Sequence, residues 1–92
     1  MNYNVAFVNL HGRRLALVEV KREPALTEPQ HQQVAEQLAA VPELRGCEIV
    51  LAMPFDGRFE AGFRAEPDVA LALRKIGWLQ LGFQPTELTL PN

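Results

Sequence analysis

The side chains with the most obvious chemical potential are two histidines and one cysteine, and they are far apart in the sequence. His11 belongs to a short Gly-containing turn, His31 lies at the edge of an amphipathic stretch, and Cys47 begins an apolar run. No metal-ligand spacing surrounds either histidine, and Cys47 has no neighbouring His in the sequence to activate it as a nucleophile. The sequence therefore predicts no metal site, no cofactor and no catalytic residue, and we expect a protein that is not an enzyme.

A second set of residues has the chemistry of a binding surface. Strand alternation is expected to place apolar side chains beside arginines on one face of a hairpin, which gives an apolar centre with a charged rim. The candidate binding residues on this face are Leu51, Met53, Phe55, Arg58 and Arg64. Such a face usually meets a partner, and a second copy of the same chain is the commonest one. The main prediction is a non-catalytic, homo-oligomeric binding or protein-interaction module, with a homodimer as its simplest form.

The same region leaves a second interpretation open, in which the protein binds a small molecule. Met53, Phe55 and Trp78 would form an apolar floor, and Arg58 and Arg64 would bind the anionic group of a small apolar ligand. Core packing and an interface rim also explain these residue types. A ligand retained through purification would favour the pocket, and a bare dimer would favour the interaction module.

These residues lie in the second copy of a pattern that the chain uses twice. The first copy reads NVAFVNL-HGR-RLALVEVK and the second reads EIVLAMPF-DGR-FEAGFRAE, so that Gly12-Arg13 aligns with Gly57-Arg58. In each copy a Gly-containing turn separates two apolar runs, which predicts a β-hairpin, and an amphipathic stretch follows. The chain is therefore expected to contain two pseudo-repeated ββα units.

The expected elements follow from periodicity and from turn residues. The first helix should run from a weak capping box at Thr27 to just before Pro42, and the second should begin at Pro67 and end with Gly82 as a left-handed cap. Gly77 either lies inside the second helix or ends it early. Strands are expected at residues 4–10, 15–21, 48–55, 58–65 and 86–90.

This order, ββαββα(β), predicts an α+β fold with a mainly antiparallel sheet and both helices on one sheet face. The first hairpin carries apolar side chains on both of its faces, as shown by the run from Leu15 to Val18. If both helices cover one face, the other face stays apolar and open, which is the physical reason for expecting a dimer. Strand order is left open, because part of the chain also spells a ferredoxin-like βαββαβ order.

Length and composition fit one domain over residues 1–92, since 48% of the residues are hydrophobic and 22% are charged. The single Cys47 excludes an intramolecular disulfide and is typical of a reducing compartment. No stretch approaches the roughly 18 to 20 apolar residues that a membrane span requires. We therefore expect a cytoplasmic protein without a membrane segment.

Residues 57–63 resemble the aromatic strand of RNA-recognition motifs, which implies nucleic-acid binding. The chain departs from that pattern because Asp56 stands where the motif has a basic residue, and because Phe59 and Phe63 are farther apart than its aromatics. The formal net charge of -2 also opposes binding to phosphates. Nucleic acid is therefore not an expected partner.

Overall fold

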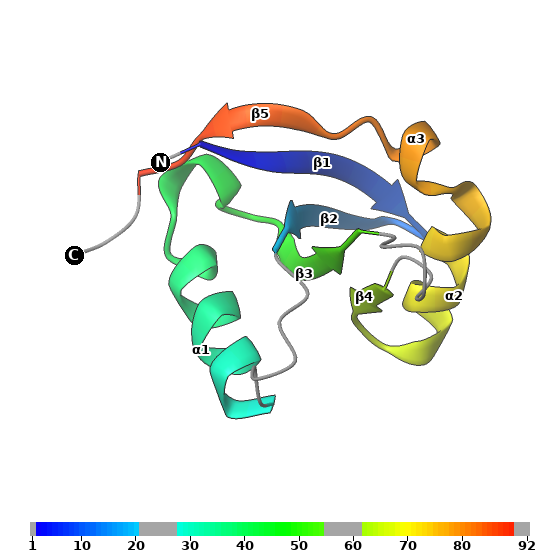
Figure 1. Cartoon of the computed structure of the whole chain (residues 1–92), viewed down its shortest axis with the longest axis horizontal. Coiled ribbons are helices and arrows are strands. Elements are labelled where there is room, and N and C mark those ends of the chain that lie inside the picture. Colours follow the sequence, from blue (N-terminus) through cyan, green and yellow to red (C-terminus); the bar gives the residue numbers. More distant parts are fainter. Residues whose placement is uncertain (1, 21–27, 55–61, 90–92) are drawn as a thin grey trace.

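The computed structural model describes residues 2–20, 28–54 and 62–89, with only the backbone described for residues 28–31. Five strands form one sheet, and helices lie against both of its faces (Figure 1). The strands are β1 (Asn2–Leu10), β2 (Arg13–Glu19), β3 (Glu48–Met53), β4 (Gly62–Arg64) and β5 (Gln84–Glu87). The helices are α1 (Glu28–Ala39), the short 3-10 helix η1 (Pro42–Leu44), α2 (Pro67–Ile76) and α3 (Trp78–Leu81). The expected mixture of helices and strands is confirmed.

The strands follow the order β4-β3-β2-β1-β5 across the sheet. The pairs β1–β2, β1–β5 and β3–β4 are antiparallel, whereas β2 and β3 are parallel. The parallel pair arises because the chain leaves β2, passes through α1 and returns to begin β3 at the same end of the sheet. The sheet is therefore mixed, and the prediction of a mainly antiparallel sheet is wrong.

A two-residue turn at His11 and Gly12 joins β1 to β2, with Leu10 paired to Arg13. Both turn residues have positive φ, 52° at His11 and 78° at Gly12. A type I′ turn requires this backbone at both central positions, and it matches the twist of the flanking strands. The glycine in the sequence thus predicted the first hairpin. The loop is shorter than the expected strands 4–10 and 15–21 implied, because only His11 and Gly12 separate the two strands.

The two helical layers cover opposite faces of the sheet. Alternation in β2 sends Leu15 and Leu17 to one face and Ala16 and Val18 to the other. The α2-face cluster comprises Ala6, Leu15, Leu17, Val50, Ala52, Phe63, Val69, Leu73 and Leu81. The α1-face cluster comprises Val5, Ala16, Val18, Leu38, Val41, Leu44, Leu51 and Leu88.

This arrangement corrects the expectation that both helices share one face. The two-sided apolar pattern of the first hairpin reflects burial on both faces, because the crossover through α1 covers the side that was expected to be open. The helices that follow β2 and β4 therefore lie on different sides of the sheet. The proposed structural equivalence of two ββα units is not confirmed, and the second turn at Asp56 and Gly57 lies outside the described residues.

The end of the chain refines two further predictions. Gly77, with a φ of 91°, ends α2 and separates it from α3, so the earlier of the two expected helix ends is correct. Gly82 caps α3 in the left-handed conformation, as predicted. The last strand covers residues 84–87 instead of 86–90, and the described part of the fourth strand is Gly62–Arg64. Within the described residues, no helix has the length and apolar character needed to cross a membrane.

Candidate functional site

Three of the residues predicted to form a binding face, Leu51, Met53 and Arg64, share one face of the sheet, and this is the face that α1 covers. Leu51 is only 2% exposed and belongs to the α1-face cluster, so its side chain is part of the core. Met53 and Arg64 are half-buried on β3 and β4, and Leu51 pairs with Arg64 across these strands. Phe55 and Arg58 lie outside the described residues. The uncovered apolar centre expected around Leu51 is therefore covered by α1.

The structure separates Met53 from Trp78, which were expected to lie together in a small-molecule site. Trp78 packs against the α2-face cluster, with its ring stacked on Phe83 at a centroid distance of 4.3 Å and 6.0 Å from Phe63. Met53 shares the strand face of Leu51, which is turned toward α1. The sheet thus lies between the two residues, and Trp78 contributes to the core.

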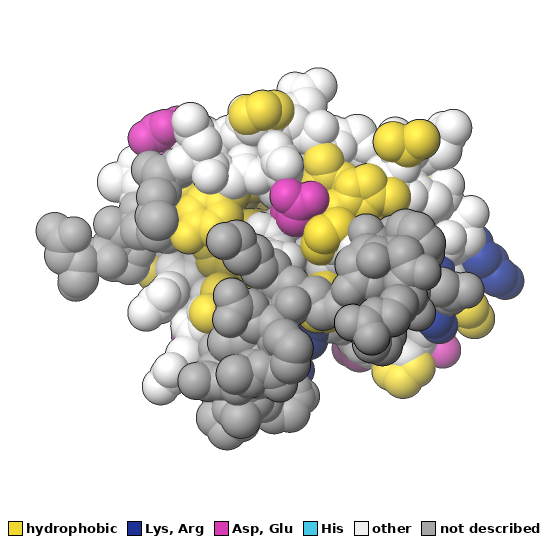
Figure 2. Space-filling model, viewed as in Figure 1, with side chains coloured by type: hydrophobic (Ala, Val, Ile, Leu, Met, Phe, Trp, Pro, Cys, Tyr) yellow, Lys and Arg dark blue, Asp and Glu magenta, His cyan; other side chains and the backbone are white. Residues whose placement is uncertain are grey.

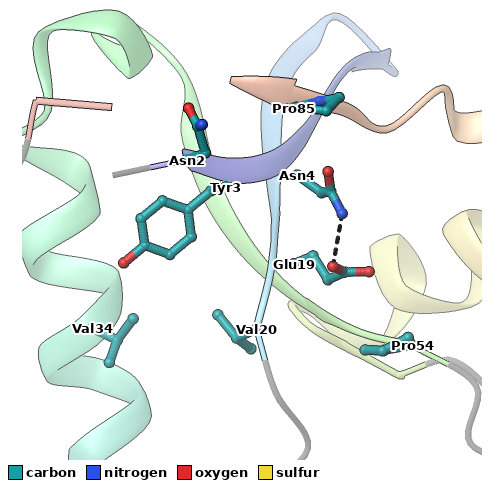
Figure 3. A pocket seen from close by; sticks show the side chains of 8 residues that line it. All are labelled: Asn2, Tyr3, Asn4, Glu19, Val20, Val34, Pro54 and Pro85. Carbon is teal, nitrogen blue, oxygen red and sulfur yellow. Dashed lines mark hydrogen bonds between the residues drawn. The ribbon is translucent and has the colours of Figure 1, made fainter. Parts of the chain in front are cut away.

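A cavity that includes neither Met53 nor Trp78 lies across one end of the central strands. We call it the strand-end groove, and its volume is about 490 Å³. It is lined by Asn2, Tyr3, Asn4, Glu19, Val20, Val34, Pro54 and Pro85. Figure 3 shows the ring of Tyr3 and the side chain of Val34 on one side of the groove, and Asn4 and Glu19 on the other.

The groove is built by β1, α1, β5 and the carboxyl ends of β2 and β3. β2 ends at Glu19 and β3 ends at Met53, so Val20 and Pro54 directly follow the carboxyl ends of the parallel pair. The antiparallel β1 begins at the same edge, and α1 contributes Val34 from above one sheet face. The carboxyl ends of parallel strands are the usual ligand position in α/β sheets. The groove therefore lies at the carboxyl ends of the one parallel pair among the described strands.

The polar centre of the groove is a pair of side chains on neighbouring strands. The amide Nδ2 of Asn4 donates a hydrogen bond to Oε2 of Glu19 over 3.0 Å (Figure 3). Glu19 is the one charged side chain among the described lining residues. Figure 2 shows an acidic group in the middle of this face with hydrophobic side chains on its borders. The lining thus combines apolar side chains with a carboxylate that accepts a hydrogen bond from Asn4.

The opposite end of β2 and β3 carries a set of ion pairs that we call the Arg13 cluster. The guanidinium of Arg13 donates from Nε to Oε2 of Glu48 over 2.7 Å and from Nη2 to Oε1 over 2.6 Å. Its Nη1 also donates to Glu66, which caps the start of α2, over 3.3 Å. Hydrogen bonding to Glu48 raises the pKa of Arg13, and the same contact lowers the pKa of Glu48. These charges are paired with each other and connect β2, β3 and α2.

The histidines and the cysteine are not brought together by the fold. His11 is exposed in the first turn, and the side chain of His31 lies outside the described set. Cys47 is a half-buried free thiol beside a smaller cavity of about 150 Å³, which Phe7 and Arg14 also line. In the described ranges, no three His, Cys, Asp or Glu side chains gather in a way that could hold a metal ion.

No protein-family model, no curated protein and no solved structure matches this chain.

The groove residues were missed at the sequence level, although two signals point to them. Glu19 interrupts the apolar run LALVEV, and Asn2 and Asn4 flank Tyr3 at the start of a strand. Polar side chains at the ends of apolar strands are usually exposed to solvent, so neither signal alone indicates a site. Only the antiparallel pairing of β1 with β2 shows that Asn4 and Glu19 lie side by side.

Proposed function

We propose that the protein is a non-catalytic binding module and that the strand-end groove holds its ligand. The observation that carries this proposal is the groove itself, an apolar recess with the Asn4–Glu19 pair on its wall. Its volume of about 490 Å³ falls within the roughly 300 to 1,000 Å³ of small-molecule pockets. The small-molecule interpretation is therefore favoured, at a different place from the one expected from Met53 and Trp78.

The chemistry of the wall supports recognition. Val20, Val34 and Pro54 offer apolar contact area, and the ring of Tyr3 offers a flat face. The polar side chains, two amides and one carboxylate, can fix the orientation of a ligand by hydrogen bonds. An apolar pocket with a few placed polar groups is the usual form of a ligand site. The free thiol of Cys47 supports the expected cytoplasmic setting.

The first test is native mass spectrometry of protein purified without denaturation, followed by thermal shifts against a panel of small organic molecules. We expect a retained mass or at least one stabilising compound. The variant Val34→Phe narrows the groove from α1 and should remove the response. The matched control Gln33→Phe adds the same ring at an exposed neighbouring position and should leave it unchanged. Equal responses in both variants would place the ligand elsewhere, and no response in the parent protein would reject the proposal.

A homo-oligomeric interaction module remains a second proposal, on a different surface from the one first expected. Among the described residues, the large apolar side chains that stay exposed include Leu71 and Ile76 on α2 and Leu79 on α3. Leu79 is 93% exposed, and contact with a second copy of the chain would remove its side chain from water. Sedimentation should then show a dimer in the parent protein and a monomer in Leu79→Ser. A parent protein that is monomeric at high micromolar concentration would contradict this proposal.

A further inference from the structure

We propose that the protein has a second ligand site, which takes a small aromatic carboxylate on the part of the α1 face beside the first turn. We call this site the hairpin shelf. It consists of the side chains of Phe7, Asn9, Arg14 and Cys47, which line the smaller cavity of about 150 Å³. None of the four is among the described lining residues of the strand-end groove, so the site goes beyond the proposed function.

The four side chains lie on the same face of the sheet. Ala16 belongs to the α1-face cluster, and Phe7 lies directly opposite Ala16 in the β1–β2 pair. Arg14 precedes Ala16 by two residues on β2 and lies opposite Asn9, so both side chains point to this face as well. Cys47 packs against the same cluster. The sheet therefore separates none of these side chains from the others.

The floor of the shelf is main chain. Val8 and Leu15 also line the cavity, but their side chains pack with the α2-face cluster on the other side of the sheet. These two residues pair with each other in the middle of the shelf. They contribute backbone atoms to the cavity, so a ligand there contacts side chains from the α1 face alone.

Phe7 offers an aromatic surface to the ligand. Its side chain is 56% exposed, and the other exposed large apolar side chains in the described ranges lie on α2 and α3. The residue opposite Phe7 is Ala16, which has a single methyl group and leaves the ring open. Aromatic rings attract one another in offset-stacked or edge-to-face arrangements. An aromatic ligand would therefore gain a ring contact and remove apolar surface of Phe7 from water.

Arg14 supplies the charge that selects a carboxylate. Its side chain is exposed, and within the described part of the chain no acidic group forms an ion pair with it. The preceding Arg13 points to the other face, where Glu48 and Glu66 accept its hydrogen bonds. A guanidinium can donate to both oxygens of one carboxylate, and the amide of Asn9, directly opposite, can donate a further hydrogen bond. A carboxylate on the shelf thus meets two donor side chains and no like charge among the lining residues.

The charge and the size of the shelf favour a small molecule over a second copy of the chain. A symmetric dimer through this surface would bring the Arg14 side chains of the two copies together, and like charges oppose such contact. The volume of about 150 Å³ is below the roughly 300 to 1,000 Å³ of sites for drug-sized ligands. A single ring with one carboxylate fits these two limits.

Three probes separate the contributions of the ring and the charge. Benzoate has both, benzyl alcohol has the ring without the charge, and acetate has the charge without the ring. Dissociation constants are measured from the amide chemical shifts of Phe7, Asn9, Arg14 and Cys47 in the full chain. We expect benzoate to bind about tenfold more tightly than either of the other probes, because charge-assisted hydrogen bonds are about twice as strong as neutral ones and the ring adds its own contact. Equal binding of benzoate and benzyl alcohol, or no saturable shift of these amides, would overturn the proposal.

A charge removal shows whether Arg14 is responsible. Arg14→Gln should abolish the preference for benzoate over benzyl alcohol, because it removes the cation from the shelf. The control Lys75→Gln removes one positive charge from an exposed position on α2 and should preserve the preference. Equal losses in both variants would indicate a general effect of net charge and would contradict the proposal. The amide spectrum of each free variant reports whether it is folded.

A ring removal tests the second contact. Phe7→Ala should weaken the binding of benzoate by about fivefold and leave the binding of acetate unchanged, since only benzoate has a ring to place against Phe7. The control Leu71→Ala truncates an apolar side chain of similar exposure, 48%, on α2 and should change neither. Unchanged benzoate binding in Phe7→Ala would contradict the role assigned to the ring.

The amides that shift also separate this proposal from the proposed function. Benzoate shifts confined to the groove residues Tyr3, Val20 and Val34 would overturn the hairpin shelf and leave the groove in place. Benzoate shifts confined to the shelf would support the hairpin shelf, whether or not a ligand of the groove is found.

Discussion

The two ends of the central parallel strands use charge in opposite ways. At the start of β2 and β3, Arg13 is held by two oxygens of Glu48 and by Glu66, so that positive and negative groups are paired within the chain. At the end of β2, Glu19 has a neutral partner, Asn4, and faces a groove. One end of the sheet thus joins three elements by ion pairs, whereas the other end borders the groove in which we propose that a ligand binds.

The comparison also separates contacts that stabilise the fold from contacts available to a ligand. The Arg13 cluster links β2, β3 and the beginning of α2, three segments that are distant in the sequence. The Asn4–Glu19 pair links only two adjacent strands that already pair through their backbones. Substitutions in the Arg13 cluster should therefore lower the stability of the fold. Substitutions in the Asn4–Glu19 pair should mainly affect ligand binding.

The largest expected effect on stability comes from a core residue in the middle of β2, between the two ends compared above. Leu17 is completely buried in the α2-face cluster, and Leu17→Ala should lower the free energy of unfolding by about 2 to 5 kcal/mol. Chemical denaturation followed by circular dichroism measures this change. The control Gln37→Ala, at an exposed position on α1, should change it by less than about 0.5 kcal/mol. Similar effects in both variants would mean that Leu17 does not lie in the core described here.

An intermediate effect is expected from Arg13→Gln, and it should depend on pH. Arg13 lowers the pKa of Glu48 in the folded protein, so the pair stabilises the fold above the ordinary Glu pKa of about 4.3. This stabilisation is lost as the pH falls through the lowered pKa of Glu48. Thermal unfolding between pH 7 and pH 2 should show a smaller acid-induced loss in the variant. Parallel curves for the two proteins would contradict the assignment, because they would mean that Arg13 does not lower the pKa of Glu48.

The smallest effect on folding is expected from Glu19→Gln. The glutamine keeps an oxygen that can accept from Asn4, so the melting temperature should stay close to that of the parent protein, whereas Glu48→Gln should lower it. Differential scanning calorimetry at neutral pH and low salt provides the comparison. Added salt should reduce the difference, because the Arg13 cluster is partly exposed. A larger loss from Glu19→Gln than from Glu48→Gln would reverse the roles assigned to the two ends.

Local sequence signals predicted the elements better than their arrangement. His11-Gly12 marked a hairpin, and Gly77 and Gly82 marked helix ends, because a positive φ is a local backbone property. The alternation that puts Phe63 on one strand face and Arg64 on the other was also visible in the sequence. These signals depend only on residues that are neighbours in the sequence, so they can be recognised before the fold is known.

The placement of the helices depended on information that is not local. The apolar residues of β2 show that both sheet faces are apolar, but they do not show whether a helix or a second molecule covers each face. The crossover through α1 decides this, and it also makes β2 and β3 parallel. Leu51 was consequently assigned to an interface when it is a core residue under α1. The strand-end groove was missed for the same reason, since it depends on which strand ends meet.

The central claim is that the groove at the ends of β2 and β3 binds a ligand, and amide chemical shift mapping tests it most directly. Titration of the labelled protein with a compound retained through purification, or with one that stabilises it in the thermal-shift panel, should move the amides of Tyr3, Glu19, Val20 and Val34 in a saturable manner. Amides near Arg13 and Glu48, at the other end of the same strands, should stay in place. Saturable shifts at the Arg13 end with none at the groove would contradict the claim.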